Sequence, residues 1–267
     1  MKNKTRLTIT LSPDLLKSVD TTIDHQLIRN RSQAIENLIS QSLTNKINTA
    51  IILAGDGGKT QRCLKKIGDR YLLSITLDHL KKHQITNVVI CAGQDNGKIK
   101  KIFGCGSNHG MTINYSPENK PLGTAGAIKN AEKFISGDSF VVIHGDILTN
   151  LNITDFIAFH NNEQVSATIA VKPRLGEKKY GQVSLQGNRI LSFSPSSTNL
   201  GISIINTGLY VFDKKILELI PKNKISNLEN DIFPLLVKGR ELSAFIFQGI
   251  WYDISAKKDY DEAKESW

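Results

Sequence analysis

The sequence of 267 residues has few cysteines and no long apolar segment. Its three cysteines, Cys63, Cys91 and Cys105, are too few and too scattered for a disulfide framework or a zinc site. No apolar run approaches the roughly 20 residues that cross a membrane, and the N-terminus does not read as a signal peptide. These absences predict a protein of the reducing cytoplasm, with no membrane-spanning helix.

The remaining composition is ordinary. Apolar residues make up 40% and charged residues 22%, which is typical of a globular protein. The formal net charge of +9 is consistent with simple solubility and also leaves room for a nucleic-acid surface. The length allows one sizeable α/β domain, or such a domain accompanied by a small module.

A short alternating stretch begins the chain. "TRLTITL" (5–11) alternates apolar and polar residues strictly, which predicts a strand with two unlike faces. The apolar face holds Leu7, Ile9 and Leu11, and the polar face holds Arg6, Thr8 and Thr10.

Two helices are predicted next. Ser12 as N-cap and Pro13 at the first helical position open the first, and Ser32 is the expected N-cap of the second. Apolar residues recur at helical spacing in both. A strand and two helices in so short a segment cannot bury a core alone, so we expect pairing with a second copy.

Residues 1–47 resemble the ribbon-helix-helix family of small DNA-binding dimers. The resemblance implies a homodimer in which Arg6, Thr8 and Thr10 enter the DNA major groove. Ser32 and nearby backbone N–H groups would hold a DNA phosphate. A dimerisation module without a DNA role is the alternative, because the segment has seven Lys/Arg against four Asp/Glu.

Residues 48–267 alternate two kinds of pattern. Continuous apolar runs separated by helical patterns predict an α/β fold with a mostly parallel sheet covered on both faces. The runs are 49–53, 87–92, 140–145 and 166–171, and helical patterns include 72–83 and 125–135.

A glycine cluster follows the first of these runs, in "LAGDGGKT" (53–60). A P-loop requires a glycine five residues before Gly58, but Leu53 stands there, so the spacing excludes one. Gly55, Gly57 and Gly58 still allow the backbone to approach a phosphate chain closely. The alternative is a plain turn between a strand and a helix.

Four other stretches accompany this loop in a fixed order, namely 115–131, 141–153, 206–212 and 249–260. Together they resemble the nucleotide-sugar pyrophosphorylases, which are sugar-1-phosphate nucleotidyltransferases with a Rossmann-like GT-A fold. The resemblance covers residues 49–265 and is strongest to short members that act on heptose- or mannose-type sugar phosphates. It implies transfer of a nucleoside monophosphate from a nucleoside triphosphate to a sugar-1-phosphate, with release of pyrophosphate.

Two carboxylates stand at predicted strand ends, Asp146 after "FVVIHG" and Asp253 after "SAFIFQGIWY". Strand-end carboxylates can converge on one hard cation, although each could instead cap a turn. The resemblance implies that both bind Mg²⁺.

The resemblance implies further site residues. Arg62, Lys59 and Asp146 would act in catalysis, and Glu229 is expected at a helix N-terminus rather than as a ligand. The nucleotide would be bound by Leu53, Ala54, Gly55, Gly58, Glu118, Pro121, Gly123 and Thr124, and the sugar by Gly181, Asn206 and Thr207.

The sequence also departs from the family pattern at phosphate-binding positions. Asp56 replaces a glycine, Thr60 replaces an arginine, and Arg62 stands where the family has lysine, with a different geometry. Pro195 and Ser196 replace an acidic and a basic residue, and the candidates to supply the missing charge are Lys172, Lys178 and Lys179. An inactive nucleotide or sugar-nucleotide sensor coupled to DNA binding is therefore the alternative to an active enzyme.

Overall fold

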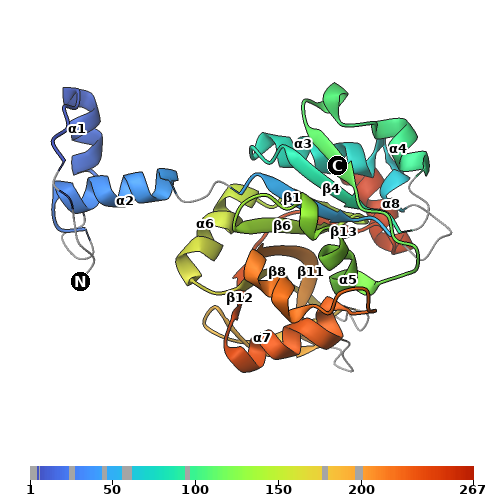
Figure 1. The fold of residues 1–267 in the computed structure, drawn as a ribbon. Helices are drawn as coiled ribbons and strands as arrows, with labels where there is room; N and C mark the ends of the chain where they lie inside the picture. The colour runs from blue at the N-terminus through green and yellow to red at the C-terminus, as the bar shows by residue number, and fades with distance from the viewer. Residues whose placement is uncertain are drawn as a thin grey trace. The chain divides into compact units, whose positions relative to one another are not determined.

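The computed structural model describes residues 5, 7–23, 28–43, 47–55, 62–93, 97–175, 180–195 and 201–267. The chain divides into two compact units, Met1–Lys46 and Ile47–Trp267. We call them the N-terminal unit and the C-terminal unit, and Figure 1 shows the elements of each. The sequence pattern places this boundary after residue 47.

The N-terminal unit contains two helices, α1 (Pro13–Asp20) and α2 (Arg31–Leu43). The N-cap prediction for α1 is confirmed, because Leu15 N donates to Ser12 Oγ at 3.4 Å. The prediction for α2 is wrong. The helix begins at Arg31, and Gln33 N donates to Asn30 Oδ1 at 3.0 Å, so Ser32 already lies in the first turn.

The described part of the predicted strand, residue 5 and residues 7–11, contains no strand. Leu7 and Ile9 are 78% and 44% exposed. A strand needs a hydrogen-bonded neighbour, and the described residues of one chain supply none here. The ribbon therefore stays a prediction for a pair of chains.

A nine-stranded sheet forms the centre of the C-terminal unit, in the order β5-β4-β1-β6-β11-β8-β12-β10-β9. Two short pairs accompany it, β2 with β3 and β7 with β13. The strands are β1 (Thr49–Leu53), β2 (Lys66–Ile67), β3 (Arg70–Tyr71), β4 (Asn87–Cys91), β5 (Thr112–Tyr115), β6 (Ser139–His144), β7 (Ile147–Thr149), β8 (Ala167–Leu175), β9 (Gln182–Gln186), β10 (Arg189–Ser194), β11 (Ile202–Asp213), β12 (Leu242–Ile246) and β13 (Trp251–Asp253).

The four predicted strands are present as β1, β4, β6 and β8, but the sheet is mixed rather than mostly parallel. β5, β4, β1 and β6 are parallel neighbours. β11 then runs antiparallel to both β6 and β8, and β10 runs antiparallel to β12 and β9. A continuous apolar run indicates that a strand is buried on both faces of the sheet. It does not indicate the direction of the strand, since β11 is buried on both faces and antiparallel to its neighbours.

The helices of this unit cover both faces of the sheet (Figure 1). The predicted helix 125–135 is divided, since α5 ends at Asn130 and a 3₁₀ turn, Glu132–Phe134, follows. No described helix is long and apolar enough to cross a membrane. The α-helices are α3 (Leu72–Lys82), α4 (Gly97–Phe103), α5 (Gly123–Asn130), α6 (Ile153–Glu163), α7 (Phe233–Gly239) and α8 (Lys257–Ser266). Shorter helical turns are Arg62–Leu64, Ser107–His109, Lys214–Leu219 and Leu228–Ile232.

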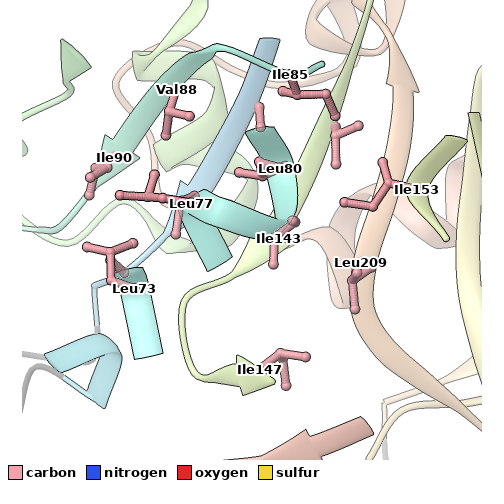
Figure 2. Packing of buried hydrophobic residues seen from close by; sticks show 14 of the residues in the cluster. Leu73, Leu77, Leu80, Ile85, Val88, Ile90, Ile143, Ile147, Ile153 and Leu209 are labelled. Atoms are coloured by element: carbon pink, nitrogen blue, oxygen red, sulfur yellow. The ribbon is translucent and has the colours of Figure 1, made fainter. Parts of the chain in front are cut away.

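The apolar core has one layer on each face of the sheet, because side chains alternate across each strand, and a smaller cluster around Leu72, Leu148 and Ile254 accompanies them. Ala50 and Ile52 of β1 face α3, α4 and α6, whereas Ile51 faces α5 and α7. Figure 2 shows the first layer, where leucines of α3 lie against isoleucine and valine side chains of β4 and β6. This packing fixes the strand ends that carry the candidate site.

Candidate active site

The two predicted metal carboxylates lie side by side at the carboxyl end of β6. Asp146 lies two residues after the end of β6, between Gly145 and β7, and Asp253 is the last residue of β13. β13 pairs antiparallel with β7, which places Asp253 opposite Ile147. Ile254 N donates to Asp146 O at 2.8 Å, so the backbone joins the two positions.

The surroundings of the two carboxylates differ. Asp253 is buried, and its oxygens accept hydrogen bonds from Tyr180 Oη at 3.0 Å and Ser255 N at 2.8 Å. Asp146 is partly buried, and its Oδ2 lies 3.1 Å from Arg62 Nη1 in an ion pair. The predicted catalytic arginine therefore contacts one predicted metal carboxylate directly.

Gly145 brings Asp146 close to the end of β1. Gly145 N donates to Leu53 O at 2.8 Å. A Cβ at Gly145 would lie 3.0 Å from Ala54 Cα and 3.1 Å from Leu53 O, tighter than most Cβ contacts, so this close approach favours glycine. Leu53, Ala54 and Gly55 thus lie beside the carboxylates, at the edge where parallel α/β sheets bind ligands.

The segment that starts at Arg62 is anchored next to both carboxylates. Lys65 Nζ donates to Ile254 O at 2.9 Å.

Several predicted positions fall outside the described residues: Arg6, Asp56, Gly57, Gly58, Lys59, Thr60, Lys178, Lys179 and Ser196.

The "PLGTAG" stretch is tightly packed at the start of α5. Gly123 has φ of +75°, and a Cβ there would lie 2.5 Å from Ser226 O, so only glycine fits. Thr124 Oγ1 accepts from Leu228 N at 2.9 Å, which ties α5 to that segment.

Glu118 and Pro121 precede α5. Leu122 N donates to Glu118 Oε2 at 3.1 Å, and burial raises the pKa of this carboxyl. Pro121 is exposed. Both residues therefore lie in the segment that leads into α5.

The three predicted sugar residues are also neighbours. Asn206 N donates to Gly181 O at 2.8 Å, and Thr207 Oγ1 donates to Ala170 O at 2.6 Å. Asn206 Nδ2 donates to Tyr210 Oη at 3.0 Å and to Glu229 Oε1 at 3.1 Å. Glu229 lies in the first turn of Leu228–Ile232, as expected, but its side chain also faces Asn206.

Comparison with known proteins supports the same conclusion as this geometry. The sequence pattern of the nucleotidyl transferase family matches residues 49–267. The chain belongs to that family. Its C-terminal unit is therefore a nucleotidyltransferase, and that part of the sequence prediction is confirmed.

Individual relatives are consistent with the family. A D-glycero-alpha-D-manno-heptose 1-phosphate guanylyltransferase from Aneurinibacillus thermoaerophilus is 29% identical, and the match covers 81% of this chain and 96% of the relative. A UTP–glucose-1-phosphate uridylyltransferase from Synechocystis is 30% identical, covering 72% of this chain and 54% of that protein. The crystal structure of HddC from Yersinia pseudotuberculosis complexed with GMP-PN superposes with a TM-score of 0.71 at 25% identity, covering 82% of this chain and 99% of HddC.

These relatives bear on the alternatives left open by the sequence. They carry the names of enzymes that form nucleotide sugars, so they give the sensor alternative no support. The family pattern matches residues 49–267, so the resemblance of residues 1–47 stays a prediction.

The carboxylate pair fits a magnesium ion. Its donors are carboxylate oxygens, the ligands that Mg²⁺ prefers, and Mg²⁺ commonly uses one or two carboxylates together with water and substrate phosphates. Among the described residues no group of three or more His, Cys, Asp or Glu could hold a metal. Two carboxylates are consistent with magnesium rather than with zinc, whose protein sites use three or four ligands.

Sequence patterns do not single out three residues that shape this site: Tyr180, Arg174 and Asp259. Tyr180 contacts Asp253, and Asp259 lies in the terminal stretch "GIWYDISAKKDY", where it reads as an ordinary residue of a helix N-terminus. Their roles depend on tertiary contacts between distant segments.

Proposed function

We propose that the C-terminal unit transfers a nucleoside monophosphate from a nucleoside triphosphate to a sugar-1-phosphate. The observation that carries this proposal is the adjacency of Asp146 and Asp253 at the carboxyl ends of β1, β4 and β6, with Arg62 on Asp146. This arrangement places two carboxylates and one guanidinium at the sheet edge where a phosphate chain would lie.

In the proposed reaction, a phosphate oxygen of the sugar-1-phosphate bonds to the α-phosphorus of the triphosphate. The bond from that phosphorus to the β-phosphate bridging oxygen breaks, and pyrophosphate leaves with its electron pair. The attacking phosphate is already anionic near neutral pH, so a strong general base is not needed. The barrier is charge repulsion and alignment, which cationic side chains and fixed geometry lower.

The chain's residues divide into four groups for this task. Arg62 neutralises phosphate charge, and the backbone of Leu53, Ala54 and Gly55 lines the phosphate path. Lys59 and Gly58 lie outside the described residues, and the sequence resemblance assigns them the same two roles. Glu118, Pro121, Gly123 and Thr124 shape the base and ribose pocket, while Gly181, Asn206 and Thr207 contact the sugar. Asp146 and Asp253 would hold Mg²⁺, which when bound supplies neutralisation and alignment of phosphate oxygens.

The relatives point to GTP with a heptose- or mannose-type sugar-1-phosphate as the first pair to test. Pyrophosphate release measured across the common triphosphates and sugar-1-phosphates, with Mg²⁺ and with EDTA, decides the proposal. We expect turnover with at least one pair, abolished by EDTA. Nucleotide binding in a thermal-shift assay without turnover of any pair would overturn it.

For the N-terminal unit we propose homodimerisation through its unburied apolar side chains. Leu7, Leu15 and Ile39 are 78%, 52% and 44% exposed. A second copy could cover them by pairing residues 5–11 into a two-stranded ribbon and packing the helices together. Sedimentation equilibrium of the full chain should give a dimer, and a monomer at high micromolar concentration would contradict the proposal.

The same ribbon would present Arg6, Thr8 and Thr10 to DNA, with Ser32 at a phosphate. Thr8, Thr10 and Ser32 are exposed in the described residues. Fluorescence anisotropy with duplex DNA should show affinity whose logarithm falls linearly with the logarithm of salt concentration. A dimer without DNA affinity at low salt would leave dimerisation as the only role.

A further inference from the structure

We infer that Arg174 and Asp259 are positioning residues that hold Asp253, and through Trp251 the sugar segment, at a fixed spacing. The inference rests on the proposed function, because it gives Asp253 its role at the metal. It begins from Asp259, which is only 3% exposed although its side chain is ionisable. A buried carboxylate requires a partner, and its partners show what it does.

Asp259 links an arginine to the backbone of Asp253. Arg174 Nη1 and Nη2 donate to Asp259 Oδ2 and Oδ1 at 2.9 and 3.0 Å, a bidentate pair. Asp253 N donates to the same Asp259 Oδ2 at 3.1 Å. The carboxylate of Asp259 therefore fixes the main chain of Asp253 and is itself fixed by a planar guanidinium.

Arg174 makes a second contact that extends toward the sugar residues. Its guanidinium carbon lies 5.2 Å from the ring centre of Trp251, two residues before Asp253 on β13. Trp251 Nε1 donates to Thr207 O at 2.9 Å. One arginine thus contacts both the indole that holds the candidate sugar segment and the carboxylate that holds Asp253.

Tyr180 contacts both Trp251 and the side chain of Asp253. Its ring meets the Trp251 ring edge-on at 5.3 Å between centres, and its hydroxyl donates to Asp253 Oδ2. Backbone and side chain of Asp253 are consequently held by different groups, Asp259 on the amide and Tyr180 with Ser255 on the carboxylate. Such outer contacts orient metal ligands and alter metal affinity.

A purely structural role is the competing explanation, since Asp259 lies at the start of α8 and could simply anchor that helix. The two explanations differ in what they predict. An anchor changes the stability of the fold, whereas a positioning residue changes the affinity for a metal ion at a given stability. A matched control is available at the other end of the sheet.

The control is Asp213, which accepts from Ser139 Oγ at 2.8 Å and lies 3.2 Å from His160 Nε2. Asp213 pairs with Ser139, the first residue of β6, whereas Asp146 follows the last. It is therefore a bonded carboxylate remote from the site, and Asp213→Asn should lower the melting temperature without changing metal affinity.

The test uses Mn²⁺ as probe, counted by electron paramagnetic resonance on the full chain with GTP and without sugar. We expect Asp259→Ala to weaken Mn²⁺ binding by about 10- to 100-fold. Asp259→Asn should weaken it less, because the amide oxygen can still accept from Asp253 N. Arg174→Lys should fall between wild type and Arg174→Met, since lysine keeps the charge and loses the bidentate geometry. The KM for the sugar-1-phosphate should rise in the Arg174 variants.

Two outcomes overturn the inference, and they are distinguishable. In the first outcome, Asp259→Ala lowers the melting temperature while Mn²⁺ affinity stays within twofold of wild type, and Asp259 is then only an anchor of α8. Asp259→Asn takes the place of Asp259→Ala if the alanine variant does not fold. That result leaves the proposed function standing if Asp253→Asn still weakens Mn²⁺ binding. If Asp253→Asn binds Mn²⁺ normally, the proposed metal site is wrong and the inference falls with it.

Discussion

In the C-terminal unit, helices cover both faces of a nine-stranded sheet, and its strands β1, β4, β6 and β11 are buried along most of their length. In the N-terminal unit, Val19 and Ala34 are the buried apolar residues among those described, while Leu7, Leu15 and Ile39 are exposed. The first buries its own core, whereas the second leaves apolar side chains exposed, which is the reason for proposing that it pairs with a second copy. Chemistry and association should therefore be separable by substitution, one unit at a time.

The largest expected effect is a loss of catalysis with no change in association. Asp253→Asn keeps the shape of the side chain but removes the charge that would hold a cation. A bound cation contributes several kcal/mol to charge stabilisation, so kcat for pyrophosphate release should fall by about a thousandfold. Sedimentation should show the same dimer as wild type. A near-normal rate would remove Asp253 from the active site.

The next effect acts on association. Ile39→Glu places a charge on the exposed apolar stripe of α2 and should weaken the dimer by at least about 30-fold, equivalent to about 2 kcal/mol. Turnover per chain should stay unchanged. The control is Leu191→Glu in the C-terminal unit, where Leu191 is 49% exposed against 44% for Ile39. If the control dissociates the dimer instead, the C-terminal unit carries the interface.

Sequence patterns predict where the strands lie along the chain better than whether each strand runs parallel or antiparallel to its neighbours. β1, β4 and β6 follow from continuous apolar runs because both faces of each strand are buried. β11 is equally buried, but it enters the sheet antiparallel between β6 and β8, and burial carries no information about direction.

The candidate site shows a similar division. The rule that strand-end residues meet at one edge anticipates that Asp146 and Asp253 are neighbours. The contact that brings them together, between the three-residue strands β7 and β13, is too short to leave a periodic pattern. The Arg174–Asp259 pair joins residues 85 positions apart, and no local signal marks either one.

A smaller effect tests how closely the C-terminal unit is packed. Gly123→Ala should destabilise this unit by about 1–3 kcal/mol and raise the KM for the triphosphate by about tenfold, because the new methyl meets Ser226 O. Gly187→Ala is the control, since Gly187 also has positive φ, +59°, with nothing within 4 Å of the added Cβ. It should lose about 1 kcal/mol from backbone strain and keep a normal KM. Urea unfolding and initial rates measure both, and equal effects of the two substitutions would contradict the close packing.

The smallest effect contrasts a carboxylate in each unit. Burial raises the pKa of Asp213, but hydrogen bonds from His160 and Ser139 lower it by more than burial raises it. The net pKa therefore lies below its ordinary value. The pKa of Asp20 is also lowered, by its hydrogen bond from Arg31, but this pair is on the surface.

A lowered folded-state pKa stabilises the protein above the unfolded pKa of about 3.9, and this contribution disappears as the pH falls through the folded pKa. The difference in melting temperature between wild type and Asp213→Asn should therefore shrink below about pH 4, from a contribution of at most about 1 kcal/mol at neutral pH. Salt distinguishes the two pairs, because exposed charges are screened more than partly buried ones. The effect of Asp20→Asn should vanish in 1 M NaCl while that of Asp213→Asn persists, and equal salt sensitivity would show that the two carboxylates are equally accessible to solvent.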